Sequence, residues 1–435
     1  MAVMHGPTVD LATWDPEDEA HWDKRFAWQT LWITTYTLML AFAVWYLVSA
    51  IAPRLNDIGY DLSKTELYWL VAVPGLAGGT MRLIYMFLPP ILGTRTLVGG
   101  TATLMLLPMV GWTLAVRDPG TPYVVLLLLA AAAGVGGGAF SGFMPSTSYF
   151  FPRRMAGTAL GLQAGVGNFG VSLIQFVTPW VVGFGLLGTT ALTPQQQTDG
   201  TEIWLHNAGL VLIPWVVLGA VLAGLFLRSV PVQANFRQQF DIFREKHTWV
   251  MTAVYVMTFG AFSGFAAQLG LLIVNEYGSF ADAPDPLKFA FLGPLIGSAT
   301  RALWGPLCDR FGGAVWTLVA GVGMTVSTLV TVLFLSPTEV GQFTGFLLAM
   351  LAVFFFAGIG NAGTFKQMPM IFERRQAGGV IGFTSSIAAF GPFLVGIGLS
   401  IVAPRAFFLG CAVYFAVCTG LVWHYYARPG APKPS

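Results

Sequence analysis

The sequence predicts an all-α membrane protein with twelve transmembrane helices in two pseudo-symmetric six-helix bundles. Hydrophobic residues make up 55% of its 435 residues and charged residues only 10%, whereas soluble domains average about 25% charged. The mean hydropathy of +0.69 is too high for a soluble fold of this size. The apolar residues recur along the whole chain, which excludes a protein with a single membrane anchor. The two halves of the chain also share a sequence pattern.

Apolar stretches of roughly 20 residues, the length that crosses ~30 Å of hydrocarbon, define the twelve expected spans. They cover residues 27–52, 67–89, 97–116, 122–148, 157–184, 206–227, 249–275, 289–308, 315–335, 342–368, 379–402 and 405–426.

Polar segments divide these spans into domains. Residues 1–26 are expected to form a solvated cytoplasmic arm, because they are polar and carry several acidic side chains. The charged linker 230–247 separates an N-terminal bundle, 27–229, from a C-terminal bundle, 248–428, and residues 429–435 form a short tail.

The distribution of lysine and arginine predicts the orientation. With the amino terminus in the cytoplasm, most basic residues outside the spans also fall on the cytoplasmic side, among them Lys24, Arg25, Arg153, Arg154, Arg374 and Arg375. We therefore expect a multi-pass protein of the inner (cytoplasmic) membrane with both termini in the cytoplasm.

An internal duplication suggests the mode of action. The pattern Gly134-Val135-Gly136, then Met144-Pro145 and Arg153-Arg154, returns as Gly358-Ile359-Gly360, Met368-Pro369 and Arg374-Arg375. Duplicated six-helix units are typical of transporters whose substrate site lies between two halves that rock against each other. Alternating access is the mechanism that this pattern predicts.

Two arginines within apolar spans are the strongest candidates for a substrate site. Arg82 and Arg301 occupy the second and eighth spans, which correspond in the duplication. An arginine at such a depth costs ~2.5 to 3.5 kcal/mol on insertion scales, so it should face a protein-lined cavity. No acidic residue falls within any predicted span to balance these charges. The pair therefore predicts an anion site.

The guanidinium group favours a particular anion. Its planar fork donates two parallel hydrogen bonds, which match a planar, monovalent oxyanion. In an empty, occluded cavity two such charges would repel each other by about 3 kcal/mol at ~6 Å and an effective dielectric of ~20. An anion removes this repulsion, so we expect both directions of transport to require one, which is antiport.

Further polar residues lie in otherwise apolar helices. Asn168, Asn361 and Thr364 are either hydrogen-bonding groups of the cavity or contacts between helices. Lys366 is either a lysine whose ammonium reaches the membrane surface or a third cavity charge that couples anion uptake to protons. In the second case the protein would be a proton-coupled symporter.

A loop motif at the end of the eighth span links the chain to a known superfamily. It consists of Gly305, Asp309, Arg310, Gly312 and Gly313. This motif, in a twelve-helix protein, resembles the major facilitator superfamily, where it acts in conformational change. The copy in the first half is degenerate, and Gly93 alone keeps its place after Arg82.

A closer resemblance is to the nitrate/nitrite porter family, and it covers nearly the whole chain. It rests on two segments, Gly136-Gly137-Gly138-Ala139-Phe140 through Gly165-Val166-Gly167-Asn168-Phe169-Gly170, and Ala357-Gly358-Ile359-Gly360-Asn361-Ala362-Gly363-Thr364-Phe365. The resemblance implies that Arg82 and Arg301 hold nitrate or nitrite. It further implies site roles for Phe140, Tyr255, Phe259 and one of Ser385 and Ser386.

A carrier of another small monovalent anion and an anion channel remain alternatives. An enzyme is not expected, because the five histidines lie at span ends or in loops and form no catalytic or metal-binding constellation with other residues in the spans. We expect no cofactor, no metal and no nucleic-acid partner. The expected partners are the lipid bilayer and the small inorganic anion, nitrate or nitrite, with the protein itself a monomer.

Overall fold

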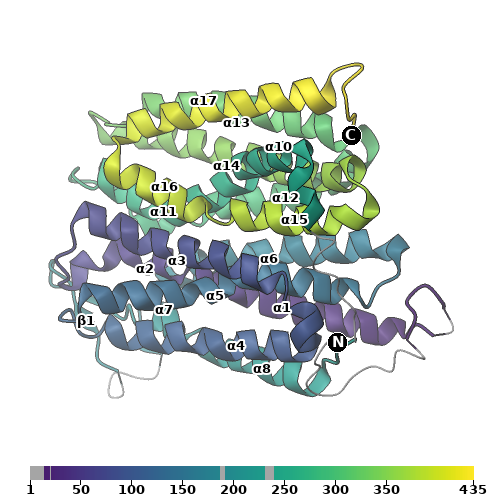
Figure 1. The fold of residues 1–435 in the computed structure, drawn as a ribbon. Coiled ribbons are helices and arrows are strands. Elements are labelled where there is room, and N and C mark those ends of the chain that lie inside the picture. The colour runs from purple at the N-terminus through teal and green to yellow at the C-terminus, as the bar shows by residue number, and fades with distance from the viewer. Residues whose placement is uncertain (1–13, 20, 187–191, 231–239) are drawn as a thin grey trace. The chain divides into compact units, whose positions relative to one another are not determined.

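The structure is a computed structural model that describes residues 14–19, 21–186, 192–230 and 240–435. It is almost entirely helical, and the elements follow one another as drawn in Figure 1. The chain forms two compact units, one made of Met1–Leu47 and Ala77–Phe236 and the other of Val48–Leu76 and Arg237–Ser435. Helix α3 contributes to both units, and each unit is described separately below.

The first unit contains five long helices and the short pair that follows them. They are α1 (Lys24–Trp45), the second part of α3 (Lys64–Tyr85), α4 (Pro89–Ala115), α5 (Tyr123–Ser148), α6 (Arg153–Val181), α7 (Asn207–Leu210) and α8 (Ile213–Phe226). Helix α8 lies alongside α4 (Figure 1). A two-stranded antiparallel sheet, β1 (Gln195–Gln196) with β2 (Glu202–Ile203), precedes α7.

The second unit contains the remaining helices. They are α2 (Leu47–Ile51), η1 (Ala52–Arg54), η2 (Asn56–Ile58), the first part of α3, η3 (Phe240–Arg244), α10 (Lys246–Tyr255), η4 (Val256–Gly260), α11 (Ala261–Tyr277), η5 (Pro286–Lys288), α12 (Leu292–Phe311), α13 (Gly313–Leu333), η6 (Val340–Gln342), α14 (Phe343–Ile371), α15 (Arg374–Ala388), α16 (Gly391–Ile401), α17 (Pro404–Val422) and η7 (Trp423–Ala427). Helix α17 runs alongside α13 (Figure 1).

Each of the twelve expected spans coincides with a helical segment. Ten segments within the described ranges are long and apolar enough to cross a membrane, and α1 with α2 and η1 forms a broken span that raises the number to eleven. Helix α12 is absent from that set, although it has 20 residues, because it carries Arg301, Asp309 and Arg310. Large apolar side chains such as Leu128, Trp180 and Leu225 are more than half exposed on the outer faces, which suits contact with lipid.

The duplication is visible in the backbone as well as in the sequence. Gly312 separates α12 from α13 with φ 90° and ψ 147°. Gly93 interrupts α4 with φ 71° and ψ 161°. Residues with a Cβ rarely adopt a positive φ. The first half therefore keeps the turn of the loop motif even though most of the motif's residues are missing there.

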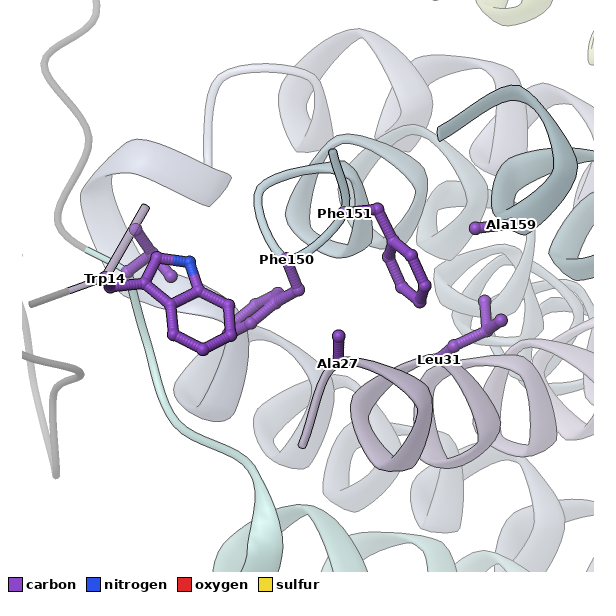
Figure 2. Packing of buried hydrophobic residues seen from close by; sticks show 7 residues of the cluster. Trp14, Ala27, Leu31, Phe150, Phe151 and Ala159 are labelled. Atoms are coloured by element: carbon purple, nitrogen blue, oxygen red, sulfur yellow. The ribbon is translucent and has the colours of Figure 1, made fainter. Parts of the chain in front are cut away.

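The described part of the amino-terminal arm, residues 14–19 and 21–26, packs against the rest of the first unit through its tryptophans. We expected residues 1–26 to be solvated, but Trp14 is buried beside Phe150 and Phe151, which follow α5 (Figure 2). Its indole N–H donates to the carbonyl of Tyr149 at 3.3 Å, and that of Trp22 donates to the carbonyl of Phe150 at 2.9 Å. The expectation of a solvated arm holds for the acidic residues Asp15, Glu17, Asp18 and Glu19, which are exposed. It is wrong for Trp14, because its indole finds both an apolar cluster and a backbone acceptor. Residues 1–13 and 20 of the expected arm lie outside the described residues.

Candidate anion site

Arg82 is completely buried on α3 in the first unit. Its Nε donates a hydrogen bond of 2.8 Å to the carbonyl oxygen of Gly137 on α5. This carbonyl belongs to the glycine-rich segment of the first half, so the interaction connects two of the features singled out in the sequence. One edge of the guanidinium is thereby fixed to the protein.

Three aromatic rings surround the same guanidinium. The Cζ atom of Arg82 lies 4.8 Å from the ring centroid of Phe140, 5.3 Å from that of Trp45 and 5.8 Å from that of Phe42. At these distances the rings attract the cation, and they do so more strongly where water is excluded. Phe140 therefore lies beside Arg82, the arginine for which the resemblance implies a role in anion binding.

Arg301 lies on α12 in the second unit and is 7% exposed. Its Cζ atom is 4.8 Å from the ring centroid of Phe365 on α14. Among the described residues, its buried Nη1 atom has no hydrogen-bond partner. A buried charged donor without an acceptor is costly, so this nitrogen is suited to bind an anion.

Aromatic contacts connect Arg301 with the two predicted residues of the seventh span. The ring of Tyr255 stacks on that of Phe259 with centroids 5.4 Å apart and an interplanar angle of 8°. Tyr255 also contacts Phe365, at 5.5 Å between ring centroids. Between Tyr255 and Phe259 the helix passes through η4, a π-helical turn, a feature found often at functional sites.

The two units thus build their arginine sites in the same way. In each, an arginine on one helix lies against the helix that carries the glycine-rich signature: α3 against α5, and α12 against α14. In each, an aromatic ring of the signature helix lies 4.8 Å from the guanidinium carbon. The sequence duplication therefore extends to the chemistry of the site.

Buried amides supply further hydrogen-bonding groups. Asn168 on α6 and Asn361 on α14 are buried, and neither end of either amide has a partner among the described residues. Gln163 on α6 has the same properties. Thr364 differs, because its hydroxyl donates to the carbonyl of Gly360 in its own helix at 2.8 Å. The amides are thus better placed than Thr364 to bind a ligand or water.

Lys366 contacts the loop motif. Its ammonium forms an ion pair with the carboxylate of Asp309, and the two side chains are 39% and 66% exposed. Gly312 supplies the turn described above, while the guanidinium of Arg310 lies over the ring of Phe311. Gly305 has open space where a side chain would be, and Gly313 begins α13. The structure thus brings Lys366 to the conformational motif.

Ser385 and Ser386 are both buried on α15. The hydroxyl of Ser385 donates to the carbonyl of Ile381, and that of Ser386 donates to the carbonyl of Gly382 at 2.8 Å. Both hydroxyl protons are therefore used within the helix, and only lone pairs remain for other partners. The geometry gives no reason to choose between the two serines.

Sequence reasoning missed several residues of the site. Phe42 and Trp45 lie one turn apart on α1 and both contact Arg82, but nothing distinguishes them among 35 phenylalanines and 14 tryptophans. Phe365 stood within a recognised signature without being given a role. Gln163 could have been predicted as a polar residue of the site, because it lies in an apolar helix five residues before Asn168.

Known proteins resemble this chain over most of its length. The family model of the Major Facilitator Superfamily matches residues 33–337. The chain is 57% identical to the probable nitrate/nitrite antiporter NarK2 of Thermus thermophilus, over 98% of both chains. It is 30% identical to the nitrate/nitrite transporter NarU of Escherichia coli (strain K12), over 96% of both.

A solved structure shows the same fold. The xylose transporter XylE from E. coli superimposes with a TM-score of 0.67 at 14% identity, over 91% of this chain and 96% of that chain. The superfamily model covers well over half of the chain, and the similar sequences extend over nearly all of it. The chain therefore belongs to the major facilitator superfamily and, within it, to the nitrate/nitrite porter family.

Proposed function

We propose that this protein is a secondary transporter that exchanges nitrate and nitrite across the cytoplasmic membrane. The observation that carries the proposal is the pair of buried arginines, one in each unit and each beside an aromatic ring of its signature helix. The similarity to a probable nitrate/nitrite antiporter over 98% of both chains supports the same substrates.

Arg82 and Arg301 bind one anion in this proposal. Its basis is the matched position of the two arginines in the duplicated sequence, and the fit of a planar fork to a planar oxyanion. Phe140, Tyr255 and Phe259 exclude water and larger substrates. Asn168 and Asn361 donate amide hydrogen bonds, and Ser385 or Ser386 adds a polar wall. Gly305, Asp309, Arg310, Gly312 and Gly313 act in the conformational change.

Exchange follows from the charge of the site. Without an anion, two positive charges would have to be enclosed together, so the empty carrier closes poorly. An anion lowers this barrier in both directions. Nitrate and nitrite carry the same charge, so their exchange is electroneutral.

The amino and carboxyl termini lie in the cytoplasm in this proposal, and the functional unit is a monomer that needs no cofactor.

The proposal is tested by transport into liposomes that contain the purified protein. Labelled nitrate should enter rapidly when the vesicles contain nitrite or nitrate, and hardly at all when they contain only an impermeant buffer. A current through single open channels would contradict a carrier. Uptake of formate or cyanate in preference to nitrate would contradict the substrate assignment while keeping the transporter class.

A further inference from the structure

Trp45 lies beside Arg82 at the end of α1. It is the last residue of α1 and is buried. The next residue, Tyr46, leaves the helical conformation with φ −100° and ψ 7°, so the first span is interrupted directly after the indole. Its ring centroid lies 5.3 Å from the Cζ atom of Arg82.

Two glycines from different helices make room for this indole. A Cβ atom on Gly78 of α3 would lie 2.7 Å from Nε1 and 2.9 Å from Cε2 of Trp45. A Cβ atom on Gly137 of α5 would lie 2.7 Å from Cε2 and 2.9 Å from Cδ2. Contacts this short do not occur, so the indole fills a space that side chains at these two positions would occupy.

The same two glycines lead directly to Arg82. Gly78 precedes Arg82 by four residues on α3, so both lie on one face of that helix. Gly137 provides the carbonyl that accepts the hydrogen bond from Arg82 Nε. The hydrogen bond fixes one edge of the Arg82 guanidinium, and the Trp45 indole lies beside the same guanidinium.

We propose that Trp45 is a positioning residue that sets the plane of the Arg82 guanidinium for a planar anion. The hydrogen bond at Nε holds one edge of the guanidinium, and packing against its faces limits how far the group can tilt. Aromatic rings beside it restrict the tilt, and tryptophan attracts a cation more strongly than the other aromatic residues. This inference rests on the proposed function, because the anion is the one assigned there.

In this proposal, selectivity between planar and pyramidal anions depends on Trp45. A tilted fork loses one of its two parallel hydrogen bonds to a planar anion such as nitrate. It loses less with chlorate, which has the same charge but is pyramidal. Disturbing Trp45 should therefore raise the half-saturation concentration for nitrate more than the inhibition constant for chlorate. A loss of packing alone would lower the amount of folded protein without changing this ratio.

The test uses Trp45→Phe, Gly78→Ala and the double variant in the liposome exchange assay. We expect Trp45→Phe and Gly78→Ala each to raise the half-saturation concentration for nitrate about tenfold, a change equivalent to about 1.4 kcal/mol. The maximal rate should fall much less. All three atoms nearest to the added methyl of Gly78→Ala belong to Trp45, so this substitution should have little further effect once Trp45 is phenylalanine.

Gly100→Ala is the matched control. It also adds a methyl to a glycine of a membrane helix in the first unit, but with no atom within 4 Å of the new Cβ. It should leave nitrate affinity and selectivity unchanged.

Three results would overturn the inference. Wild-type nitrate affinity and selectivity in both single variants would show that Trp45 only fills space. Strictly additive effects in the double variant would show that Gly78 acts through another contact. Absence of nitrate exchange in the wild type would remove the proposed function, and this inference with it.

Discussion

The two arginines of the site differ in how far their surroundings fix them. Arg82 is completely buried, has three rings beside it and donates through Nε to Gly137. Arg301 is 7% exposed and has Phe365 beside its guanidinium. A lysine at either position would keep the positive charge but not the planar fork. At position 82, its single ammonium group would have to serve both the Gly137 carbonyl and the anion.

We therefore expect Arg82→Lys and Arg301→Lys each to reduce nitrate exchange in liposomes to near the background rate. Arg95→Lys and Arg54→Lys are suitable controls, one in each unit. Arg95 donates to the carbonyl of Gly224, and Arg54 pairs with Asp57 and Asp285, so neither belongs to the proposed site. Full nitrate transport by the lysine variants of Arg82 and Arg301 would show that charge alone is sufficient.

His206, next to the first residue of α7, provides a test of pH dependence. The Oε1 atom of Gln195 accepts a hydrogen bond from the backbone N–H of Leu205 at 2.9 Å. The Nε2 atom of Gln195 must therefore be the donor to His206 Nδ1, at 3.0 Å, so this ring nitrogen is an acceptor and the imidazole is neutral. Burial, together with the nearby charge of Arg117, lowers the pKa of His206.

A lowered pKa means that the unfolded chain binds a proton more readily than the folded one. Stability should thus be constant above the ordinary histidine pKa of about 6.5 and fall as the pH drops below it. His206→Asn keeps an acceptor for Gln195 but cannot be protonated. We expect the thermal unfolding temperature of this variant to decline less between pH 7 and 5 than that of the wild type. Identical declines would contradict the assigned hydrogen bond.

At the scale of the elements, the described part of the amino-terminal arm has two kinds of residue. Its acidic side chains are exposed, as their charge predicts, whereas Trp14 is buried, which the sequence analysis did not predict. Trp14 has T-shaped contacts with Phe26 and Phe150, with ring centroids 6.0 and 5.6 Å apart. The arm thereby joins the beginning of α1 to the turn between α5 and α6 within the first unit.

This attachment predicts a loss of stability when the indole is removed. Trp14→Ala should lower the free energy of unfolding by up to the ~3 to 5 kcal/mol seen for large-to-small core substitutions. Trp22→Ala should cost less, because Trp22 is only half-buried. Trp32→Ala is the control, since Trp32 is 52% exposed on α1. Thermal unfolding in detergent measures all three, and equal stability of Trp14→Ala and wild type would contradict the role of the arm.

The position of each helix could be predicted from the sequence, although α4 begins at Pro89, before the predicted span 97–116. The internal geometry of the helices could not be predicted. Runs of apolar residues locate the spans because the bilayer requires a fixed length. The break at Tyr46 and the π-helical turn at Val256–Gly260 lie within predicted spans, and no residue pattern marks them. The interruption at Gly93, in contrast, lies in the predicted loop between two spans. The span predicted at 289–308 coincides with α12, although Arg301, Asp309 and Arg310 make this helix less apolar than the other membrane helices.

At the scale of the whole molecule, the charged residues of the candidate site were easier to predict than the aromatic residues that contact them. Arg82 and Arg301 stand out because charge is rare in apolar spans. Their aromatic neighbours Phe42, Trp45 and Phe365 do not stand out, because aromatic residues fill membrane helices throughout this chain. Duplication indicates which helices correspond, but it does not indicate which ring faces which guanidinium.

The coupling mechanism is a property of the whole molecule, and Lys366 was the residue proposed to link it to protons. The sequence left two roles open for this lysine, membrane-surface contact or proton coupling. In the structure its ammonium pairs with Asp309 of the loop motif, and both side chains are partly exposed. An exposed ion pair contributes at most about 1 kcal/mol to stability, so its loss should shift the conformational equilibrium only modestly.

We therefore expect Lys366→Gln and Asp309→Asn to behave alike, because each removes the same ion pair. Both should change the rate of nitrate exchange by a few-fold, and both should keep the requirement for an anion inside the vesicles. Neither should make uptake depend on a pH gradient. The measurement is labelled nitrate uptake with and without internal nitrite, and with and without a pH gradient. The contradicting result would be proton-driven accumulation of nitrate in anion-free vesicles that is lost in Lys366→Gln but kept in Asp309→Asn. That result would show symport in place of exchange, and a role of Lys366 that does not depend on Asp309.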